Sequence, residues 1–386
     1  MKKIFVLFIC LLLTGCSFIK DDSVKIVVAS DLHYLADNLY DDGDAFVDYV
    51  TNDDGKASLY INEIVDSFIE EMLKLKPEIV VLTGDISFEG EKLSHEELAE
   101  KLSKLTDNGI KVALIPGNHD LNNNDAKGYS GDTKYAVESV TIDEFKKIYK
   151  DMGYGNAQSY DEDSLSYLME IDEKNWALMV DVNGSKDSLS ISSSTYDWIK
   201  SILKKAQNND INVFVFMHQN LLDHNVDSEQ YKIKDSDDEF YYLLKDYGVK
   251  ALFSGHSHMQ HYIDLYGVKE ITSSSLATYP CQYGIVKIND KGIVYNTKPL
   301  ELKHSTEIKD IFINTITKQQ GSKLSDPDMS AYYVDLLINF YLGTMDKVEY
   351  NEEILKGIEN FNMSLYLDIK SMLDEIGNNY NTIVIE

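Results

Sequence analysis

The sequence predicts an α/β domain followed by an all-helical C-terminal extension. Apolar runs of strand length alternate with segments of helical spacing over residues 24–300, which is typical of α/β proteins. Beyond about residue 305 the apolar residues recur only at helical spacing, as at Tyr333, Leu336 and Phe340. A chain of 386 residues is long enough for one large domain and a smaller one. We therefore expect one domain over residues 24–300 and a helical domain over residues 301–386.

Residues 1–15 are predicted to be a lipoprotein signal peptide. Lys2 and Lys3 precede an apolar run over residues 4–13 that is too short to span a bilayer comfortably. The following Leu13-Thr14-Gly15-Cys16 resembles a bacterial lipobox, in which the cysteine is lipidated and becomes the mature N-terminus. Lipidated Cys16 and a tether over residues 16–23 would hold the protein at the extracellular face of the cell membrane. The alternative is an ordinary signal peptide with an incidental cysteine.

The chain is strongly acidic and contains no arginine. It has 65 Asp and Glu residues against 36 basic residues, all lysine, and a formal net charge of −29. Loss of residues 1–15, which hold two lysines and no acid, would take the charge to −31. This surface would repel duplex nucleic acid, so we expect no such partner. Without arginine, a phosphate group must be bound by metal ions, lysines, neutral donors or backbone N–H groups.

Five apolar runs are predicted to be buried strands, and each ends in a cluster of Asp, His or Asn. These runs cover residues 24–30, 78–83, 111–115, 212–217 and 250–253. Paired strands are expected at 165–169 and 176–182, and short antiparallel strands over 261–298. Cys281 is the one cysteine outside residues 1–16, so we expect no intramolecular disulfide.

Segments of helical spacing lie between these strands. They are expected at 59–76, from Ser94 to Gly109, from Thr141 onward, at 194–206 and at 237–247, and in the extension at 306–318, 329–343, 351–359 and 363–376. Ser94 and Glu97 have the spacing of an N-terminal capping box, and Thr141 with Glu144 opens another helix. Residues 36–57, rich in Asp, Asn and Gly, are predicted to be a long loop.

The residues that indicate a metal site, Asp, His and Asn, lie at the ends of these predicted strands. The motifs are Asp31-Leu32-His33, Gly84-Asp85, Gly117-Asn118-His119-Asp120, His218 and Gly255-His256-Ser257-His258. In α/β sheets, ligands bind at the carboxyl ends of the strands. Because residues two apart in a strand point to the same side, Asp31 and His33 are expected to reach one ion together. Carboxylate, imidazole and carboxamide ligands suit Mn²⁺, Zn²⁺ or iron.

The order of these motifs resembles that of the calcineurin-like metallophosphoesterase superfamily, over roughly residues 24–300. The resemblance implies a two-sheet αββα sandwich with a dinuclear metal centre at the sheet edge. It implies that the first ion is held by Asp31, His33 and His258, and the second by Asn118, His218 and His256, with Asp85 bridging both. It also implies that His119 is the catalytic acid and that Asp120 orients it.

This resemblance implies hydrolysis of a phosphoester on two divalent ions, with Mn²⁺ favoured over iron or zinc. Two ions acidify a shared water to hydroxide and neutralise the phosphate oxygens during in-line attack on phosphorus. A neighbouring imidazole can protonate the leaving alkoxide. The metals would then replace the arginine that the chain lacks.

The sequence departs from the patterns of protein phosphatases and surface nucleotidases, and these departures favour the phosphodiesterase branch of the superfamily. Gly84-Asp85 continues as Ile-Ser-Phe-Glu-Gly, which is not the pattern of protein phosphatases. The roughly 85 residues after position 301 are too few for the nucleoside-binding domain of surface nucleotidases. The chain is similar to exported lipoprotein phosphodiesterases of low-GC Gram-positive bacteria, which act on small cyclic or linear nucleotide diesters. A phosphomonoesterase for phosphate scavenging and a non-catalytic lipoprotein that binds metal or solute stay open as alternatives.

The role of the helical extension also has two interpretations. Its apolar face must bury against a neighbour, and the adjacent domain is the nearest one. The extension would then either stabilise the sandwich or form a wall over the metal cleft that restricts access to small diesters.

Overall fold

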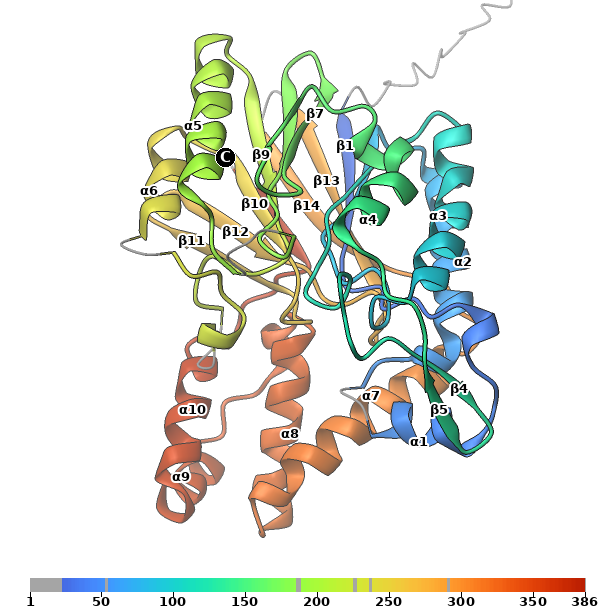
Figure 1. Cartoon of the computed structure of the whole chain (residues 1–386). Helices are drawn as coiled ribbons and strands as arrows, with labels where there is room; N and C mark the ends of the chain where they lie inside the picture. Colours follow the sequence, from blue (N-terminus) through green and yellow to red (C-terminus); the bar gives the residue numbers. More distant parts are fainter. Residues whose placement is uncertain are drawn as a thin grey trace, which may run out of the picture.

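The computed structural model describes residues 23–385, apart from residues 53–54, 185–188, 225–227, 236–237 and 290–291. Two β-sheets form its centre, with helices on both outer sides (Figure 1). The predicted signal peptide and Cys16 lie outside the described residues, so the lipid anchor stays a prediction. Within the described part of the chain, no helix has both the length and the apolar character needed to cross a bilayer.

The first sheet has six strands in the order β15-β14-β13-β1-β2-β3. Strands β1, β2 and β3 are parallel, whereas β13 runs antiparallel to β1. The bounds are β1 Val24–Ala29, β2 Ile79–Leu82, β3 Lys111–Leu114, β13 Gln282–Asn289, β14 Gly292–Pro299 and β15 Thr382–Ile385. All of β2 is buried, in agreement with its unbroken apolar sequence.

The second sheet has seven strands in the order β11-β12-β10-β9-β8-β7-β6. Strands β12, β10, β9 and β8 are parallel, and β11 and β7 are antiparallel to their neighbours. The bounds are β6 Ser159–Tyr160, β7 Tyr167–Asp172, β8 Asn175–Met179, β9 Asn212–Phe216, β10 Ala251–Ser254, β11 His261–Leu265 and β12 Val268–Thr272. The antiparallel run expected over 261–298 is therefore two hairpins that belong to different sheets.

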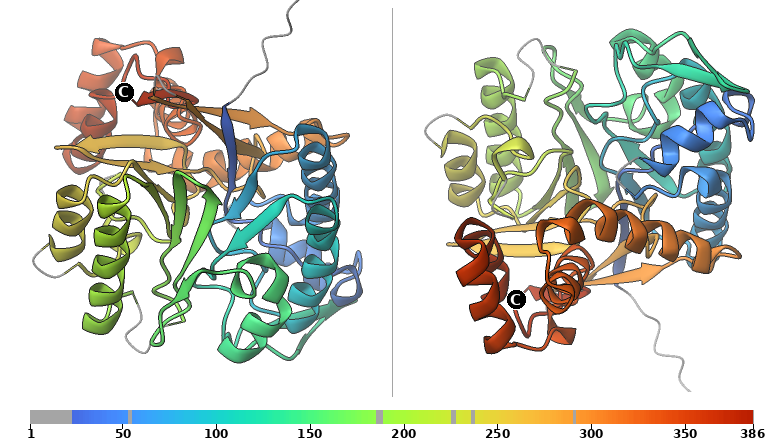
Figure 2. Two further views of the ribbon diagram at one scale, coloured as in Figure 1. Left: turned by 90° about the horizontal axis from the view of Figure 1, so that it is seen from above. Right: turned by 90° about the horizontal axis from the view of Figure 1, so that it is seen from below.

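One apolar core joins the two sheets. The Tyr167 hydroxyl on β7 accepts a hydrogen bond from Leu114 N (2.9 Å) and donates one to Leu114 O (3.0 Å) on β3. Helices lie outside both sheets (Figure 2), α2 Ile61–Leu75 and α3 Lys92–Asp107 on one side and α5 Ser193–Asn208 and α6 Glu239–Asp246 on the other. The α/β class and the predicted two-sheet sandwich are thus confirmed.

One predicted loop and two predicted helix starts can be compared with the structure. The loop expected over 36–57 contains a helix, α1 Asp44–Thr51. Helix α3 begins at Lys92, and the expected capping box of Ser94 and Glu97 is wrong, because Ser94 donates to Glu91 and Glu97 accepts from the Tyr34 hydroxyl. The capping box of Thr141 and Glu144 does form, at the start of α4 Ile142–Ile148. Before α4 the chain also forms a hairpin of β4 Lys127–Ser130 and β5 Thr133–Ala136.

The C-terminal extension has its own apolar cluster. Its helices are α7 Ser305–Gln320, α8 Pro327–Tyr341, α9 Glu352–Phe361 and α10 Met363–Leu373, close to the expected segments. The expectation of an all-helical extension is wrong in its last residues, because β15 returns to pair antiparallel with β14. The alternating sequence Thr-Ile-Val-Ile, buried at Ile383 and Ile385, fits an edge strand with one apolar face. The extension is therefore fastened to the first sheet at its end.

Candidate metal centre

The predicted ligands come together where five parallel strands of the two sheets end. Asp31 and His33 follow β1, Asp85 follows β2, and Asn118 and His119 follow β3. From the second sheet, His218 follows β9, and His256 and His258 follow β10. The structure brings six of these side chains together in two groups of three.

Several of these residues have a left-handed backbone. The φ angles are 54° at Asp31, 45° at His33, 46° at Asp85, 65° at His256 and 56° at His258. Each residue lies beyond its strand, so the expectation that Asp31 and His33 share a side by strand alternation is wrong in its reason. Non-glycine residues adopt this conformation at a cost of about 1–3 kcal/mol each, and such positions concentrate at functional sites.

Two glycines allow the loops to approach one another. A Cβ on Gly255 would lie 1.8 Å from Ser30 Oγ and 2.6 Å from Asp31 Oδ2. A Cβ on Gly117 would lie 2.2 Å from Asp85 Oδ1. Both positions therefore require glycine, because any side chain there would push a predicted ligand out of the centre.

The first group consists of Asp31, His33 and His258, whose ligand atoms all lie within 4.8 Å of one another. His33 Nε2 and His258 Nε2 are 3.2 Å apart, and His258 Nε2 is 3.4 Å from Asp31 Oδ1. Asp31 is fully buried; its Oδ2 accepts from His256 N at 3.1 Å, whereas Oδ1 has no hydrogen-bond partner among the described residues. A buried carboxylate oxygen in this position is suited to bind a cation.

The second group consists of Asp85, His218 and His256, again within 4.8 Å. His218 Nε2 lies 3.2 Å from Asp85 Oδ2 and 3.1 Å from Asn118 Oδ1. The other ring nitrogen, His218 Nδ1, donates to the Thr83 carbonyl at 2.8 Å, which leaves a lone pair on Nε2 in the neutral ring. Asn118 thus joins this group through its side-chain oxygen.

This donor set fits two divalent cations. In the second group, the Asp85 carboxylate and the Asn118 carboxamide oxygen lie beside His218 Nε2, and each of these three atoms can offer a lone pair to a cation. Imidazole and carboxylate in this mixture suit Mn²⁺, Zn²⁺ or iron. One candidate group holds Asp31, His33 and His258 and the other holds Asp85, His218 and His256, and the assignment of each residue to an ion stays a prediction. Asp85 lies with the second group, and its bridging role stays a prediction.

Charge coupling keeps the buried carboxylate of Asp85 ionised. Burial alone would raise the pKa of Asp85, but the neighbouring His218 holds this pKa well below its ordinary value. Burial acts in the opposite sense on His218, where the charge of Asp85 outweighs it and raises the pKa to about 9. Burial, and then the proximity of His218, lowers the pKa of His256 to about 4. A metal ion binds an ionised carboxylate and a neutral imidazole, so an ion bound at this group would displace the proton from His218 Nε2.

His119 lies beside both groups with its ring held by Glu89. The His119 Nδ1–H donates to Glu89 Oε2 at 2.9 Å, while Nε2 lies 3.9 Å from Asp85 Oδ2. Burial lowers the pKa of His119, but the hydrogen bond to Glu89 and the charges of Asp85 and Glu89 together raise it to about 9. The ring therefore presents Nε2 to the centre as a proton donor.

The predicted role of Asp120 in orienting His119 is corrected by these contacts. The buried Asp120 carboxylate accepts hydrogen bonds from Ile86 N (3.2 Å), Ser87 N (2.8 Å), Ser87 Oγ (2.6 Å) and Gly117 N (2.7 Å). Asp120 thus joins the loops after β2 and β3 and positions the ligands on both. Glu89 orients the imidazole, and its place four residues after Asp85 carried no periodic signal that could have identified it.

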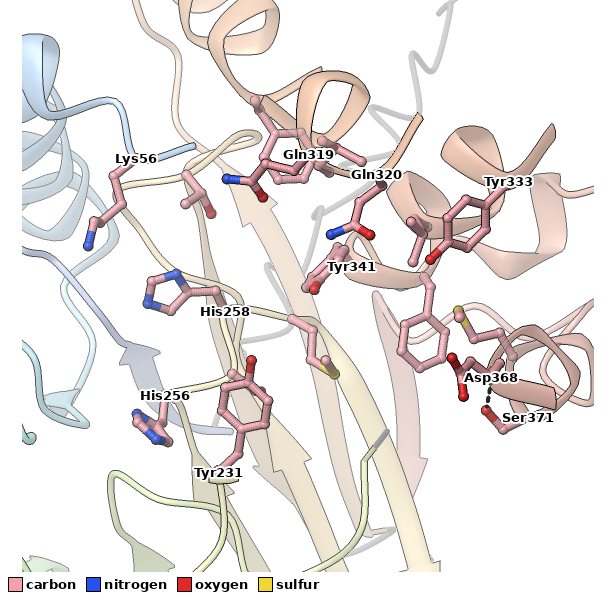
Figure 3. Close-up of a pocket in the computed structure, with 18 of the residues that line it drawn as sticks. Lys56, Tyr231, His256, His258, Gln319, Gln320, Tyr333, Tyr341, Asp368 and Ser371 are labelled. Carbon is pink, nitrogen blue, oxygen red and sulfur yellow. Dashed lines mark hydrogen bonds between the residues drawn. The ribbon is translucent and has the colours of Figure 1, made fainter. Parts of the chain in front are cut away.

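Lys56 is a second residue that the motifs did not indicate. Its side chain is buried, and it lines the same cavity as Asp85 and His119 (Figure 3). Its backbone forms a bridge with Thr278, which fixes the lysine at the cavity wall. Its positive charge contributes to the lowered pKa of His33, after the larger effect of burial. Lys56 stands in a segment expected to be loop, so only the fold brings it to the centre.

Other histidines have structural contacts. His95 is buried, and its ring contacts the Tyr149 hydroxyl and the Asp120 carbonyl, each at 3.0 Å. His224 and His261 contact each other through Nδ1 atoms 3.0 Å apart, beside Glu270. His304 pairs with Glu63. His95 therefore supports the metal centre indirectly through the backbone of Asp120.

Comparison with known proteins agrees with this site. A family model described as calcineurin-like phosphoesterase matches residues 24–260, a range that contains every predicted ligand. The chain belongs to the calcineurin-like phosphoesterase family. Membership of this family, together with the two ligand groups, supports a metal-dependent phosphoester hydrolase. No protein in a search of curated sequences matches this calcineurin-like phosphoesterase.

Several solved structures are similar to this chain. A dimetal phosphatase from Danio rerio is similar over 72% of this chain and 96% of its own, with 12% identity and a TM-score of 0.54. The purple acid phosphatase PPD1 from yellow lupin (Lupinus luteus) is matched over 72% of this chain and 52% of its own, with 13% identity and a TM-score of 0.47. At such identity the likeness to the Danio rerio protein shows the fold of this calcineurin-like phosphoesterase, and its substrate must be argued from the site.

Proposed function

We propose that this protein is a dinuclear-metal-dependent phosphodiesterase that hydrolyses small nucleotide diesters, cyclic or linear. The observation that carries the proposal is the cavity on which the metal centre opens. Asp85, His119, His256 and His258 line one cavity of about 460 Å³ whose opposite wall is formed by helices of the C-terminal extension. This volume lies in the range that encloses a small organic ligand. A walled cavity supports a small substrate over a protein or a long polymer.

The proposed chemistry assigns each part of the site a task. Two bound divalent ions would supply the activated water and neutralise the phosphate oxygens. Asp31, His33 and His258 would hold one ion, and His218, His256 and Asn118 the other, with Asp85 between them. His119 would give the Nε2 proton to the leaving oxygen as its bond to phosphorus breaks. Glu89, 2.9 Å from Nδ1, would keep the ring in the donating orientation.

Lys56 is proposed to bind a non-bridging phosphate oxygen. The chain has no arginine for this task, and Lys56 is a buried cation on the wall of the same cavity. Lys56→Met, which keeps the stem and removes the charge, should lower kcat/KM for a diester about 10-fold, because a hydrogen bond to a charged group contributes roughly 1.5–3 kcal/mol. Lys104→Met on the exposed side of α3 removes the same charge and is the control. Equal kinetics of the two variants would exclude a phosphate contact by Lys56.

The diester preference is tested with one Mn²⁺-loaded preparation and two substrates. Bis-p-nitrophenyl phosphate and p-nitrophenyl phosphate release the same leaving group, so their kcat/KM values compare diester and monoester directly. We expect the diester value to exceed the monoester value by at least about 10-fold, or roughly 1.4 kcal/mol. A faster monoester reaction would indicate a phosphomonoesterase. No turnover of either ester would favour the non-catalytic alternative.

A further inference from the structure

The far wall of the cavity is built by residues outside the family match. The match ends at residue 260, whereas the cavity is also lined by α7, α8 and α10. From these helices the lining side chains include Phe312, Gln319, Gln320, Tyr333, Tyr341 and Asp368. The extension therefore adds to the metal centre a surface that lies outside the range of the family match.

This wall is fixed in place next to the metal ligands. Gln260, two residues after His258, donates from its backbone N–H to the Tyr341 carbonyl (2.9 Å), and its side chain donates to the Tyr380 carbonyl (3.1 Å). The Tyr295 hydroxyl on β14 donates to Gln260 Oε1 at 3.0 Å. At the other end of the wall, Lys318 on α7 donates to Asn52 at 3.0 Å. The helices are thus held at a set distance from the centre, as a binding wall requires.

The side chains on the wall suit a planar, polar ring. Figure 3 shows Gln319, Gln320 and Tyr341 extending from the helices toward the same space that Tyr231 enters from the opposite side. Tyr231 is itself held against the metal site, with its ring 5.4 Å from the His256 ring and at 70° to it. Aromatic rings of this kind stack on bases, and carboxamides offer both donors and acceptors to the base edge. Asp368 adds an acceptor for an exocyclic amine.

We infer that the extension forms a nucleoside-binding compartment, in which Tyr341 contacts the face of the base and Gln320 contacts its edge. The inference rests on the proposed phosphodiesterase function and names the part of the substrate that the wall recognises. A phosphate at the metal centre would place its nucleoside between Tyr231 and the helices. A purely aliphatic substituent would make no use of the carboxamides and the carboxylate.

The test compares two diesters with the same leaving group. Thymidine 5′-(p-nitrophenyl phosphate) carries a nucleoside, and methyl p-nitrophenyl phosphate does not. We expect the ratio of their kcat/KM values to favour the thymidine ester in the native enzyme. It should fall about 10-fold in Tyr341→Ala, since base stacking contributes about 1–3 kcal/mol, and about 5-fold in Gln320→Ala, since a neutral hydrogen bond contributes about 1 kcal/mol. Tyr341→Phe keeps the ring and should keep most of the ratio. Tyr350→Ala, an exposed tyrosine of the same extension, should leave it unchanged.

The outcomes separate this inference from the proposed function. A native ratio near one, or an unchanged ratio in both Tyr341→Ala and Gln320→Ala, overturns the compartment while hydrolysis itself stands. If neither ester is cleaved, the proposed function fails. Calorimetry with thymidine 5′-monophosphate and the metal-loaded protein then measures binding in the compartment independently of catalysis. Its Kd should rise about 10-fold in Tyr341→Ala if the stacking contact exists; an unchanged Kd contradicts it. Unfolding midpoints and metal content of each variant identify any loss of fold.

Discussion

Asp85→Asn is expected to release both metal ions and to lower kcat for a diester on the order of 10³-fold or more. The substitution keeps the shape of the side chain and an oxygen that accepts from His119 N, a contact of 2.9 Å, but removes the buried negative charge. Mutation of a residue that only orients a metal ligand lowers metal affinity or activity about 10–100-fold. Loss of a carboxylate that binds both ions should therefore lower activity further. Elemental analysis after dialysis, alongside turnover of bis-p-nitrophenyl phosphate, gives both values.

Asp31→Asn is the matched control for this result. Asp31 is equally buried but belongs to the first ligand group only. Its loss should release one ion and leave the group of Asp85, His218 and His256 occupied. If Asp85→Asn also releases only one ion, Asp85 is an ordinary ligand of the second site and the bridging role is wrong.

His119→Gln should retain both ions and lose on the order of 10²–10⁴ in kcat, the range of general acid catalysis. The expectation follows from the position of His119, with Nε2 toward the centre and Nδ1 held by Glu89. Because p-nitrophenolate leaves with little protonation, the loss should be much smaller for p-nitrophenyl esters than for an alkyl diester such as a dinucleotide. Glu89→Gln should show the same dependence on the leaving group with a smaller loss.

Two other outcomes would change the role of His119. An equal loss with every leaving group would make it a positioning residue instead of an acid. Loss of an ion in His119→Gln would make His119 a ligand, and the proton for the leaving oxygen would then have to come from another group or from water.

The sequence was most informative where Asp, His or Asn residues that can bind a metal ion come soon after a buried strand. The motifs at Asp31, Asp85, Asn118, His218 and His256 each follow a short apolar run, so the ends of parallel strands bring them together without any knowledge of long-range contacts. The same locality explains the helix start at Thr141, since a capping box is contained within four residues.

Features that depend on distant contacts were not predictable from the pattern. Glu89 becomes relevant only because the loop after β3 brings His119 to it, and Lys56 only because its backbone pairs with Thr278. Ser94 has the sequence of a cap, but Glu91 competes for its hydroxyl. The last strand, β15, is four residues long and follows four helices, so its sequence was interpreted as part of the helical extension. Its partner β14 lies far away in sequence, and the local pattern could not indicate the pairing.

Phosphodiester hydrolysis in this site is proposed to require two metal ions. The most direct test removes metal with a chelator, restores Mn²⁺ in steps, and measures bound metal per chain and bis-p-nitrophenyl phosphate hydrolysis on the same samples. We predict a plateau at two ions per chain, with most of the activity gained as the second ion binds. Saturation at one ion per chain, or full hydrolysis with the chelator still in excess, would contradict a reaction on two metal ions.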